Sequence, residues 1–270
     1  GLGTRLDWGP PLDPRHEVLS CRQLNRVIDH AVDDLTITVE AGLPLQDLQD
    51  LLAQQGQWLP IDWPRAGAPG SIGGLVARGL AGGLRHRHLG VRDQIIGIGL
   101  LRADGTEAHA GGRVVKNVAG YDLMRLLCGS WGSLALITEL TLRLQPQRPA
   151  RSSLLVEGDL KAQEGFRSEL LRSSLTPERC DWINGGDGAW RLRLVVSSVS
   201  EQAVDDQLKQ LEELALNQQL SAERQACSDA LTTPFDASPS AQLVRLVLPP
   251  AQLHGLLRDE AMRALKPWTW

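Results

Sequence analysis

The feature that most restricts the fold of this chain is a glycine-rich run, Ala68–Gly83, with the sequence APGSIGGLVARGLAGG. It places six glycines within sixteen residues, inside an otherwise apolar region. Because glycine loses more backbone entropy on folding than any other residue, such a cluster indicates tight turns or a close approach of backbone to a ligand. The first half, PGSIGG, predicts a loop whose amides can surround an anion. The second half, LVARGLAGG, predicts a short helix that ends at Gly82 or Gly83.

Three common glycine motifs are absent. The G-x-G-x-x-G of a Rossmann fold does not follow the apolar stretch Leu35–Val39, and neither a P-loop nor the G-x-S-x-G of a hydrolase occurs. A second glycine-rich loop lies at residues 1–9. Two such loops are typical of a binding site in which the pyrophosphate of a ligand lies along backbone that carries no side chains.

Composition excludes several classes of protein. A net charge of −4 argues against a nucleic-acid partner. The four cysteines are widely spaced, which favours free thiols in a reducing compartment over a disulfide framework. The histidines show no metal-binding spacing, so we expect no metal site. No apolar run reaches the roughly 18–20 residues of a membrane span. Both ends of the chain lack the usual signals of a domain end, so we expect that it is cut from a longer protein.

Periodic apolar residues predict the elements up to residue 146. The strand that ends at Pro146 should carry its even-numbered leucines on one face: Leu134, Leu136, Leu140, Leu142 and Leu144. The preceding elements are a strand at 35–42, a helix from Pro44 to Gly56, a hairpin turning at Asp104-Gly105 and a short helix closed by Gly129.

The sequence pattern changes after the segment QPQRPA, and this change predicts a domain boundary near residue 148. The strands and helices expected beyond it lie at 153–158, 159–174, 180–185, 190–197, 200–218 and 242–248, an order typical of a ferredoxin-like fold. Arg191 and Arg193 share one strand face, where they can bind a carboxylate, face solvent or contact a partner. The run Arg85–His88 fits a solvated loop or a contact with a partner or an acidic lipid.

Residues 1–148 resemble the FAD-binding domain of the vanillyl-alcohol-oxidase/PCMH superfamily. The resemblance rests on the segments TITVEAGLPLQDL, PGSIGGLVARGLAGG, GVRD and GSWGSLALITELTLRLQP. Within the superfamily, GRVVKNVAGYDL is similar to the D-2-hydroxyacid branch, which includes flavin-binding subunits of glycolate oxidases. The implied fold class is α+β. A PCMH-type FAD-binding domain of two α+β subdomains, the first truncated at the N-terminus, spans residues 1–148. A smaller ferredoxin-like cap domain, truncated at its C-terminus, spans residues 149–270.

The resemblance also implies a set of cofactor-binding residues, and it assigns no catalytic residue. Five groups are matched: Gly1, Gly3 and Thr4 in the first pyrophosphate loop; Pro69, Gly70, Ser71, Ile72, Gly73 and Gly74 in the second; Ala77, Gly79 and Gly82 in the following turn; Gly90, Val91, Arg92 and Asp93 in a G-[ST]-V-R-D segment; and Ile137, whose backbone meets the flavin nucleotide. Side chains in the loops would hold the backbone away from the phosphates.

The chain departs from the family pattern at several positions. Gly79 stands where asparagine is usual, and Leu89-Gly90 replaces Gly-[ST]. The first loop has no histidine, so the resemblance implies non-covalent FAD. Arg92 and Asp93 can also simply pair across their turn.

The implied activity is that of an FAD-dependent oxidoreductase: a subunit of a glycolate oxidase complex that supports oxidation of glycolate or a related D-2-hydroxy acid. The implied partners are a larger FAD-containing subunit and, as a further candidate, an iron–sulfur subunit, in the cytoplasm or at the inner face of the membrane through those partners. The alternative is a non-catalytic flavin-carrying scaffold or electron-relay subunit. Reduction of a UDP-N-acetylmuramate type is a third candidate that KNVAGYDL disfavours.

Overall fold

The computed structural model describes residues 1–4, 13, 15, 17–62, 70–112, 122–184, 187–227, 246 and 249–264. The chain divides into two compact units. The first comprises Gly1–Ala81 and Leu89–Gln147, and the second comprises Gly82–His88 and Arg148–Trp270. Among the described helices, none combines the length and the hydropathy needed to cross a membrane.

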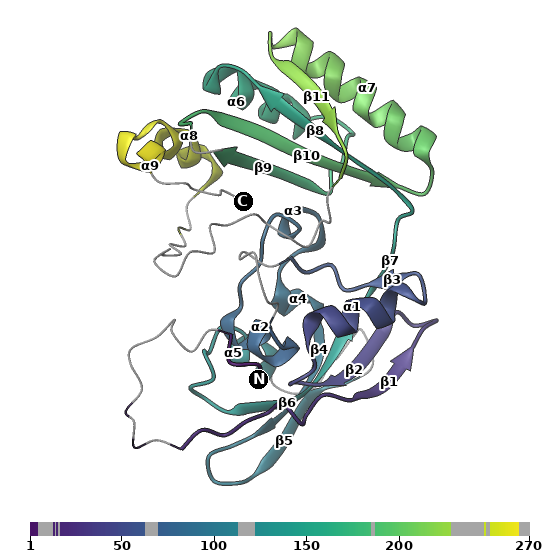
Figure 1. The fold of residues 1–270 in the computed structure, drawn as a ribbon, viewed down its shortest axis with the longest axis vertical. Helices are drawn as coiled ribbons and strands as arrows, with labels where there is room; N and C mark the ends of the chain where they lie inside the picture. The colour runs from purple at the N-terminus through teal and green to yellow at the C-terminus, as the bar shows by residue number, and fades with distance from the viewer. Residues whose placement is uncertain are drawn as a thin grey trace. The chain divides into compact units, whose positions relative to one another are not determined.

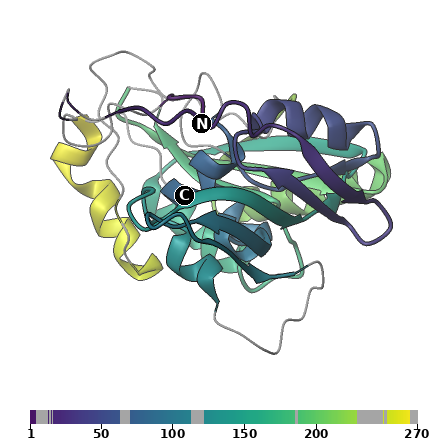
Figure 2. The same cartoon turned by 90° about the horizontal axis from the view of Figure 1, so that it is seen from below.

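The first unit is built on an antiparallel sheet with the strand order β1-β2-β6-β4-β5 (Figure 1). Its strands are β1 (Val27–Ala31), β2 (Thr36–Glu40), β4 (Ile95–Leu101), β5 (Glu107–Gly111) and β6 (Leu136–Arg143), and β3 (Gln57–Trp58) pairs with β7 (Gln145–Pro146) beside it. Its helices are α1 (Leu45–Ala53), α2 (Ile72–Arg78), α4 (Val91–Gln94) and α5 (Leu123–Leu127). The helix α1 lies beside β2 in two views (Figures 1 and 2).

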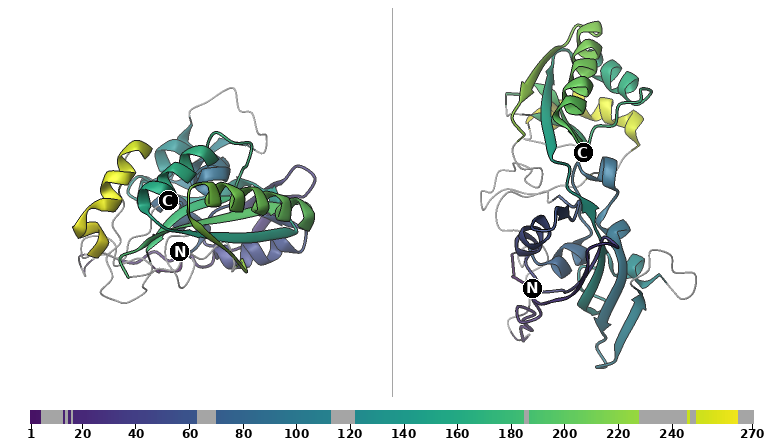
Figure 3. Two further views of the ribbon diagram at one scale, coloured as in Figure 1. Left: turned by 90° about the horizontal axis from the view of Figure 1, so that it is seen from above. Right: turned by 90° about the vertical axis from the view of Figure 1, so that its right-hand side faces the viewer.

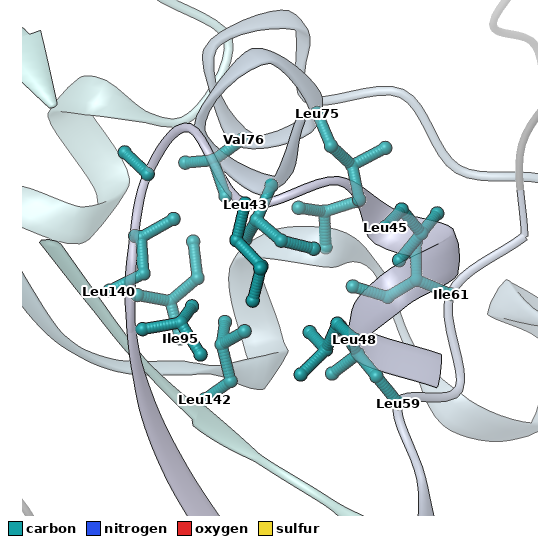
Figure 4. Close-up of a cluster of buried hydrophobic side chains, with 14 of the residues drawn as sticks. Leu43, Leu45, Leu48, Leu59, Ile61, Leu75, Val76, Ile95, Leu140 and Leu142 are labelled. Carbon is teal, nitrogen blue, oxygen red and sulfur yellow. The ribbon is translucent and has the colours of Figure 1, made fainter. Parts of the chain in front are cut away.

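The core of this unit lies between the sheet and the helices α1 and α2. Figure 4 shows Leu48 of α1 and Leu75 of α2 directed toward Leu140 and Leu142 of β6. All four side chains are at most 1 % exposed. The leucine spacing that predicted a helix after Pro44 and the apolar run that predicted strand β2 are therefore confirmed.

The face expected for the leucines of β6 is correct for only part of the strand. Leu140, Leu142 and Leu144 are fully buried, whereas Leu134 is 52 % exposed. Gly99 pairs with Glu139 but the next residue, Leu100, pairs with Ile137, so β6 carries one extra residue there. Such a bulge reverses which side chains face inward. Before the bulge, Ile137 rather than Leu136 is therefore the buried side chain.

The second unit has the ferredoxin-like order of elements that the sequence predicted. Its sheet, ordered β11-β8-β10-β9, is covered on one face by α6 and α7 (Figures 1 and 3). The elements are β8 (Ala150–Glu157), α6 (Leu160–Leu170), β9 (Arg179–Asn184), β10 (Trp190–Ser198), α7 (Glu201–Asn217) and β11 (Ser221–Gln225), followed by α8 (Pro250–Arg258) and α9 (Glu260–Ala264).

The fourth strand of that sheet is not the one expected from sequence. β11 occupies the edge position, while the expected strand at 242–248 falls, apart from Leu246, outside the described residues. β11 reads SAERQ and has no apolar alternation, because most of its side chains face solvent. Periodicity therefore gives no signal for it.

A short helix, α3 (Arg85–His88), belongs to the second unit although its sequence lies between α2 and α4 of the first. It packs next to β9 (Figure 1). The chain consequently passes between the units at three points, 81/82, 88/89 and 147/148.

Candidate functional site

The glycine-rich loop leads into α2 through Ser71, which caps that helix. The hydroxyl oxygen of Ser71 accepts a hydrogen bond from the amide of Gly74 at 3.3 Å. Ser71 also forms an isolated bridge with Pro44, in which the amide of Ile72 donates to Leu43. The loop is thus fixed to the segment that joins β2 to α1.

The two predicted pyrophosphate loops meet in the structure. A Cβ built on Gly1 would lie 2.5 Å from Oγ of Ser71, so the first loop packs directly on the second. The left-handed backbone of Gly3 (φ +71°) turns the first loop, and Arg22 donates to the carbonyl of Leu2 at 3.3 Å. The N mark beside α2 in Figure 1 shows the same proximity.

The backbone amides of Gly70 and Ser71 have no acceptor among the described residues. Both residues are buried, and Ser71 is only 2 % exposed. Because a buried amide without a partner costs about 1–3 kcal/mol, native proteins rarely leave one unpaired. Two adjacent donors at the junction of two glycine loops are the chemistry that an anion requires.

The amides that follow are already used within the protein. Ile72 donates to Leu43 at 2.9 Å, and Gly73 donates to the carbonyl of Ala41 at 2.7 Å. A Cβ on Gly73 would lie 2.7 Å from Cβ of Ala41 and 2.8 Å from its carbonyl oxygen. The need for glycine at 73 is therefore set by packing against Ala41, whereas the expectation from sequence was that a phosphate sets it.

Ala41 is a residue of this site that sequence reasoning missed. It follows β2 directly, and its amide donates to the carbonyl of Thr138 in β6 at 2.9 Å. A small residue at the end of a buried strand, immediately before Gly42, was the signal available. Through Ala41 the glycine loop is tied to the central strand of the sheet.

At the other end of α2, Gly79 closes the helix in the left-handed conformation (φ +61°). A Cβ there would lie 3.0 Å from Cα of Gly129. The chain after α5 runs over this end, with the amide of Gly129 donating to Val76. Asparagine is usual at this position in the resembled family. Glycine at 79 instead allows the close approach of the backbone at Gly129.

An arginine–tryptophan pair lies at the same end of α2. The guanidinium of Arg78 is 4.0 Å from the ring centre of Trp131. Trp131 is 54 % exposed, has a left-handed backbone (φ +59°) and donates its amide to Ala77. Neither side chain was expected at the site.

The segment Gly90–Asp93 begins α4, which packs against α2. The amide of Gly90 donates to a carboxylate oxygen of Asp93 at 3.0 Å. Arg92 lies 3.4 Å from Asp93 and 4.0 Å from Asp122, so the alternative reading, in which Arg92 and Asp93 pair across the turn, describes their geometry. Val91 is buried in the core.

The remaining predicted residues are dispersed. Ile137 places its side chain in the core, which leaves only its backbone for a ligand. Thr4 lies with Gly3 in the first loop. Gly82 belongs to the second unit. Pro69 lies outside the described residues.

Comparison with known proteins finds similarity to flavin-binding proteins. Residues 2–111 match the family model described as "FAD binding domain". The chain is 34 % identical over 194 residues to glycolate oxidase subunit GlcE of Escherichia coli K12, an alignment that covers 72 % of this chain and 54 % of that protein. It is 31 % identical to glycolate oxidase subunit GlcD of Bacillus subtilis 168 (68 % of this chain, 39 % of that protein). It is 36 % identical to D-2-hydroxyglutarate dehydrogenase of Xanthomonas citri (58 % and 33 %).

Solved structures agree on the fold. Alkyldihydroxyacetonephosphate synthase superposes with a TM-score of 0.62 at 15 % identity, covering 74 % of this chain and 41 % of that one. The chain spans about half the length of GlcE and a smaller share of the other relatives. Residues 2–111 are thus similar to FAD-binding domains, as the resemblance seen in the sequence implied.

Proposed function

We propose that the chain binds FAD non-covalently, with the diphosphate held between the loops Gly1–Thr4 and Gly70–Gly74. The observation that carries this proposal is the pair of amides of the buried residues Gly70 and Ser71, for which the described part of the chain supplies no acceptor. Phosphate oxygens are acceptors that satisfy such donors without a lysine. The family match over residues 2–111 supports FAD as the ligand.

The residues around these amides fit that ligand. The exposed Gly74 presents no side chain, and a Cβ there would meet only Oγ of Ser71, at 3.3 Å. Arg92, at 39 % side-chain exposure, adds a cation whose charge Asp93 partly offsets. Bound FAD supplies an acceptor for a hydride from the substrate. The protein's own part is to hold and orient the nucleotide.

We further propose that the chain works as a subunit of a complex that oxidises glycolate or a related D-2-hydroxy acid. Two of the relatives above are named as glycolate oxidase subunits and a third as a D-2-hydroxyglutarate dehydrogenase. The partner we propose is a larger FAD-containing subunit, with an iron–sulfur subunit as a further candidate.

The charges of the second unit favour a supporting role for this chain. Oxidation of a hydroxy acid needs a cation for the carboxylate and a base for the hydroxyl proton. Arg193 and Arg179 both pair with Asp181, at 3.2 and 2.9 Å, and Arg151 pairs with Glu178. Arginines that neutralise internal carboxylates are poorly suited to hold a substrate. The same observation favours the second candidate function, a flavin-carrying scaffold or electron relay.

The cofactor proposal is tested by titrating the protein with FAD. Gly74→Val should keep the fold and weaken FAD binding at least about tenfold, since a side chain there meets the ligand rather than the protein. Gly255→Val is the matched control, because Gly255 is also an exposed helical glycine and a Cβ there meets nothing within 4 Å. Equal affinity of wild type and Gly74→Val would show that the diphosphate lies elsewhere. Acid precipitation should release the flavin into the supernatant.

The activity proposal is tested by glycolate-dependent dye reduction, with and without the larger flavoprotein subunit. We expect reduction only when both are present, and loss of FAD binding in this chain should lower it. If the complex keeps full activity without flavin in this chain, the scaffold reading is correct. Strong dye reduction by the chain alone would refute the supporting role.

A further inference from the structure

The segment Gly82–His88, called the strap below, has an unusual position in the chain. It belongs to the second unit, while the residues on both sides of it, Ala81 and Leu89, belong to the first. The candidate cofactor residues Gly79 and Gly90 lie within three residues of its two ends. Contacts that fix the conformation of the strap therefore also restrain the backbone at Gly79 and Gly90, which is only a few covalent bonds away.

One end of the strap is fixed by a buried histidine–carboxylate contact. Nε2 of His88 lies 3.3 Å from Oε1 of Glu178, and these side chains are 13 % and 5 % exposed. Glu178 also pairs with Arg151 of β8. Burial alone would raise the pKa of Glu178, but the hydrogen bond with His88 and the charge of Arg151 hold it below its ordinary value. His88 thus contacts a carboxylate that is ionised near neutral pH.

The other end of the strap packs on a buried ion pair. A Cβ on Gly83 would lie 2.2 Å from Oδ1 of Asp181 and 2.8 Å from Nε of Arg179. The side chains of Arg179 and Asp181 are 2 % and 1 % exposed. Leu84, the next residue, is fully buried. The backbone at 83 cannot carry a side chain without displacing two buried charges.

The chain is strained where it leaves the strap. Leu89 has a left-handed backbone (φ +69°) and an exposed side chain. A non-glycine residue in this region costs about 1–2 kcal/mol. Leu89 is followed at once by Gly90, which caps α4. Strain of this kind persists only where the surrounding structure imposes the conformation.

We propose that the strap is a positioning element for the cofactor: its contacts within the second unit hold residues 82–88 in one conformation, and this sets the geometry of the backbone that continues from its two ends to Gly79 and Gly90. This inference rests on the FAD-binding function proposed above. His88 and Gly83 are positioning residues, which act on the cofactor through the backbone without touching it. Occupancy of the flavin site then depends on an intact ion-pair cluster in the second unit.

The test compares FAD affinity in His88→Ala, Gly83→Val and His88→Gln. The first two should bind FAD about tenfold more weakly, a typical coupling between sites. His88→Gln should recover most of the affinity, because its amide can still donate to Glu178. Arg191→Ala is the control, since Arg191 pairs with Glu157 and Asp187 in the same sheet and not with the strap. Circular dichroism checks folding, and amide hydrogen exchange at residues 89–94 should accelerate in His88→Ala.

The outcomes separate this inference from the proposed function. Wild-type protein that binds no FAD contradicts both. Wild-type protein that binds FAD, with His88→Ala equal to it in affinity and in exchange at 89–94, contradicts the strap alone. If Gly83→Val does not fold, His88→Ala and its partial rescue by glutamine decide the question.

Discussion

The glycine loops of the first unit and the sheet of the second unit bury different kinds of polar group. At the glycine loops of the first unit, the buried groups are neutral: amides of Gly70 and Ser71 and a capping hydroxyl. On the sheet of the second unit they are ions, with Arg179 and Asp181 almost wholly shielded from solvent. The first arrangement is set by backbone geometry and leaves donors for the ligand that we propose. The second is set by charge and is completed within the protein.

This difference has consequences for sensitivity to mutation and pH. A buried ion pair stabilises the folded state little more than apolar packing would. Removing only one of its two charged groups, however, lowers the free energy of unfolding strongly. Backbone donors do not titrate, so a site made from them should keep its affinity over a wide pH range. Side-chain substitutions should therefore unfold the second unit more readily, whereas substitutions at glycine should act on the first.

The largest expected effect is that of Asp181→Ala. It removes the buried carboxylate with which both Arg179 and Arg193 pair. We expect the free energy of unfolding to fall by about 3–5 kcal/mol, measured by urea denaturation. The double variant Arg179→Leu with Asp181→Leu should lose clearly less unfolding free energy than Asp181→Ala does. A double variant as unstable as the single one would show that packing, and not charge, dominates there.

The next effect is that of Gly73→Val in the first unit. Its side chain must displace Ala41, whose carbonyl accepts the amide of Gly73. Overpacking of this kind destabilises by about 1–3 kcal/mol. Thermal unfolding of Gly73→Val and Gly74→Val should therefore differ, with only the first losing stability. Equal melting temperatures would contradict the packing role assigned to Gly73.

A smaller effect is expected on lowering the pH. Because the pKa of Glu178 lies below its ordinary value of 4.5 in the folded protein, the unfolded state takes up the proton first. The stability that Glu178 contributes is present above pH 4.5 and is lost as the pH falls through the folded pKa. Urea denaturation at pH 3.5–7 should show this decline, and Glu178→Gln should reduce it.

The smallest effect is expected for Leu89→Gly. Glycine relieves about 1–2 kcal/mol of left-handed strain but loses about 0.5–1 kcal/mol of backbone entropy. Since Leu89 is 56 % exposed, little burial is lost. Unfolding free energy should rise by less than about 1 kcal/mol. A fall in stability would mean that the leucine side chain makes contacts that matter.

Local patterns predicted most of the secondary structure. The Asp104-Gly105 turn was read correctly, and Gly105 adopts the left-handed backbone (φ +81°) that such a turn demands. The leucine stripe of α1 was equally clear. β11 and the bulge in β6 were not predicted, because both depend on neighbours that are distant in sequence. The placement of residues 82–88 in the second unit has the same cause.

The candidate site was predicted at the level of segments but not of atoms. The family resemblance assigned Gly1 and Ser71 to two separate pyrophosphate loops, and the structure packs these loops together. Their role in binding the cofactor stays a prediction. Which amides are left for a ligand depends on pairing with Ala41 and Leu43, far back in the chain. No local signal separates Gly73, which packs on the protein, from Gly74, which does not.

The edge strand β11 limits how the second unit can associate. An outermost strand exposes unpaired backbone groups that can recruit a strand from another chain. β11 reads SAERQ, and its Arg224 is held by Asp205 and Glu212 of α7. A charged, mostly polar edge of this kind discourages sheet extension and aggregation. If the chain has the partner subunit proposed above, we expect that subunit to dock through side-chain surfaces and not by adding a strand here.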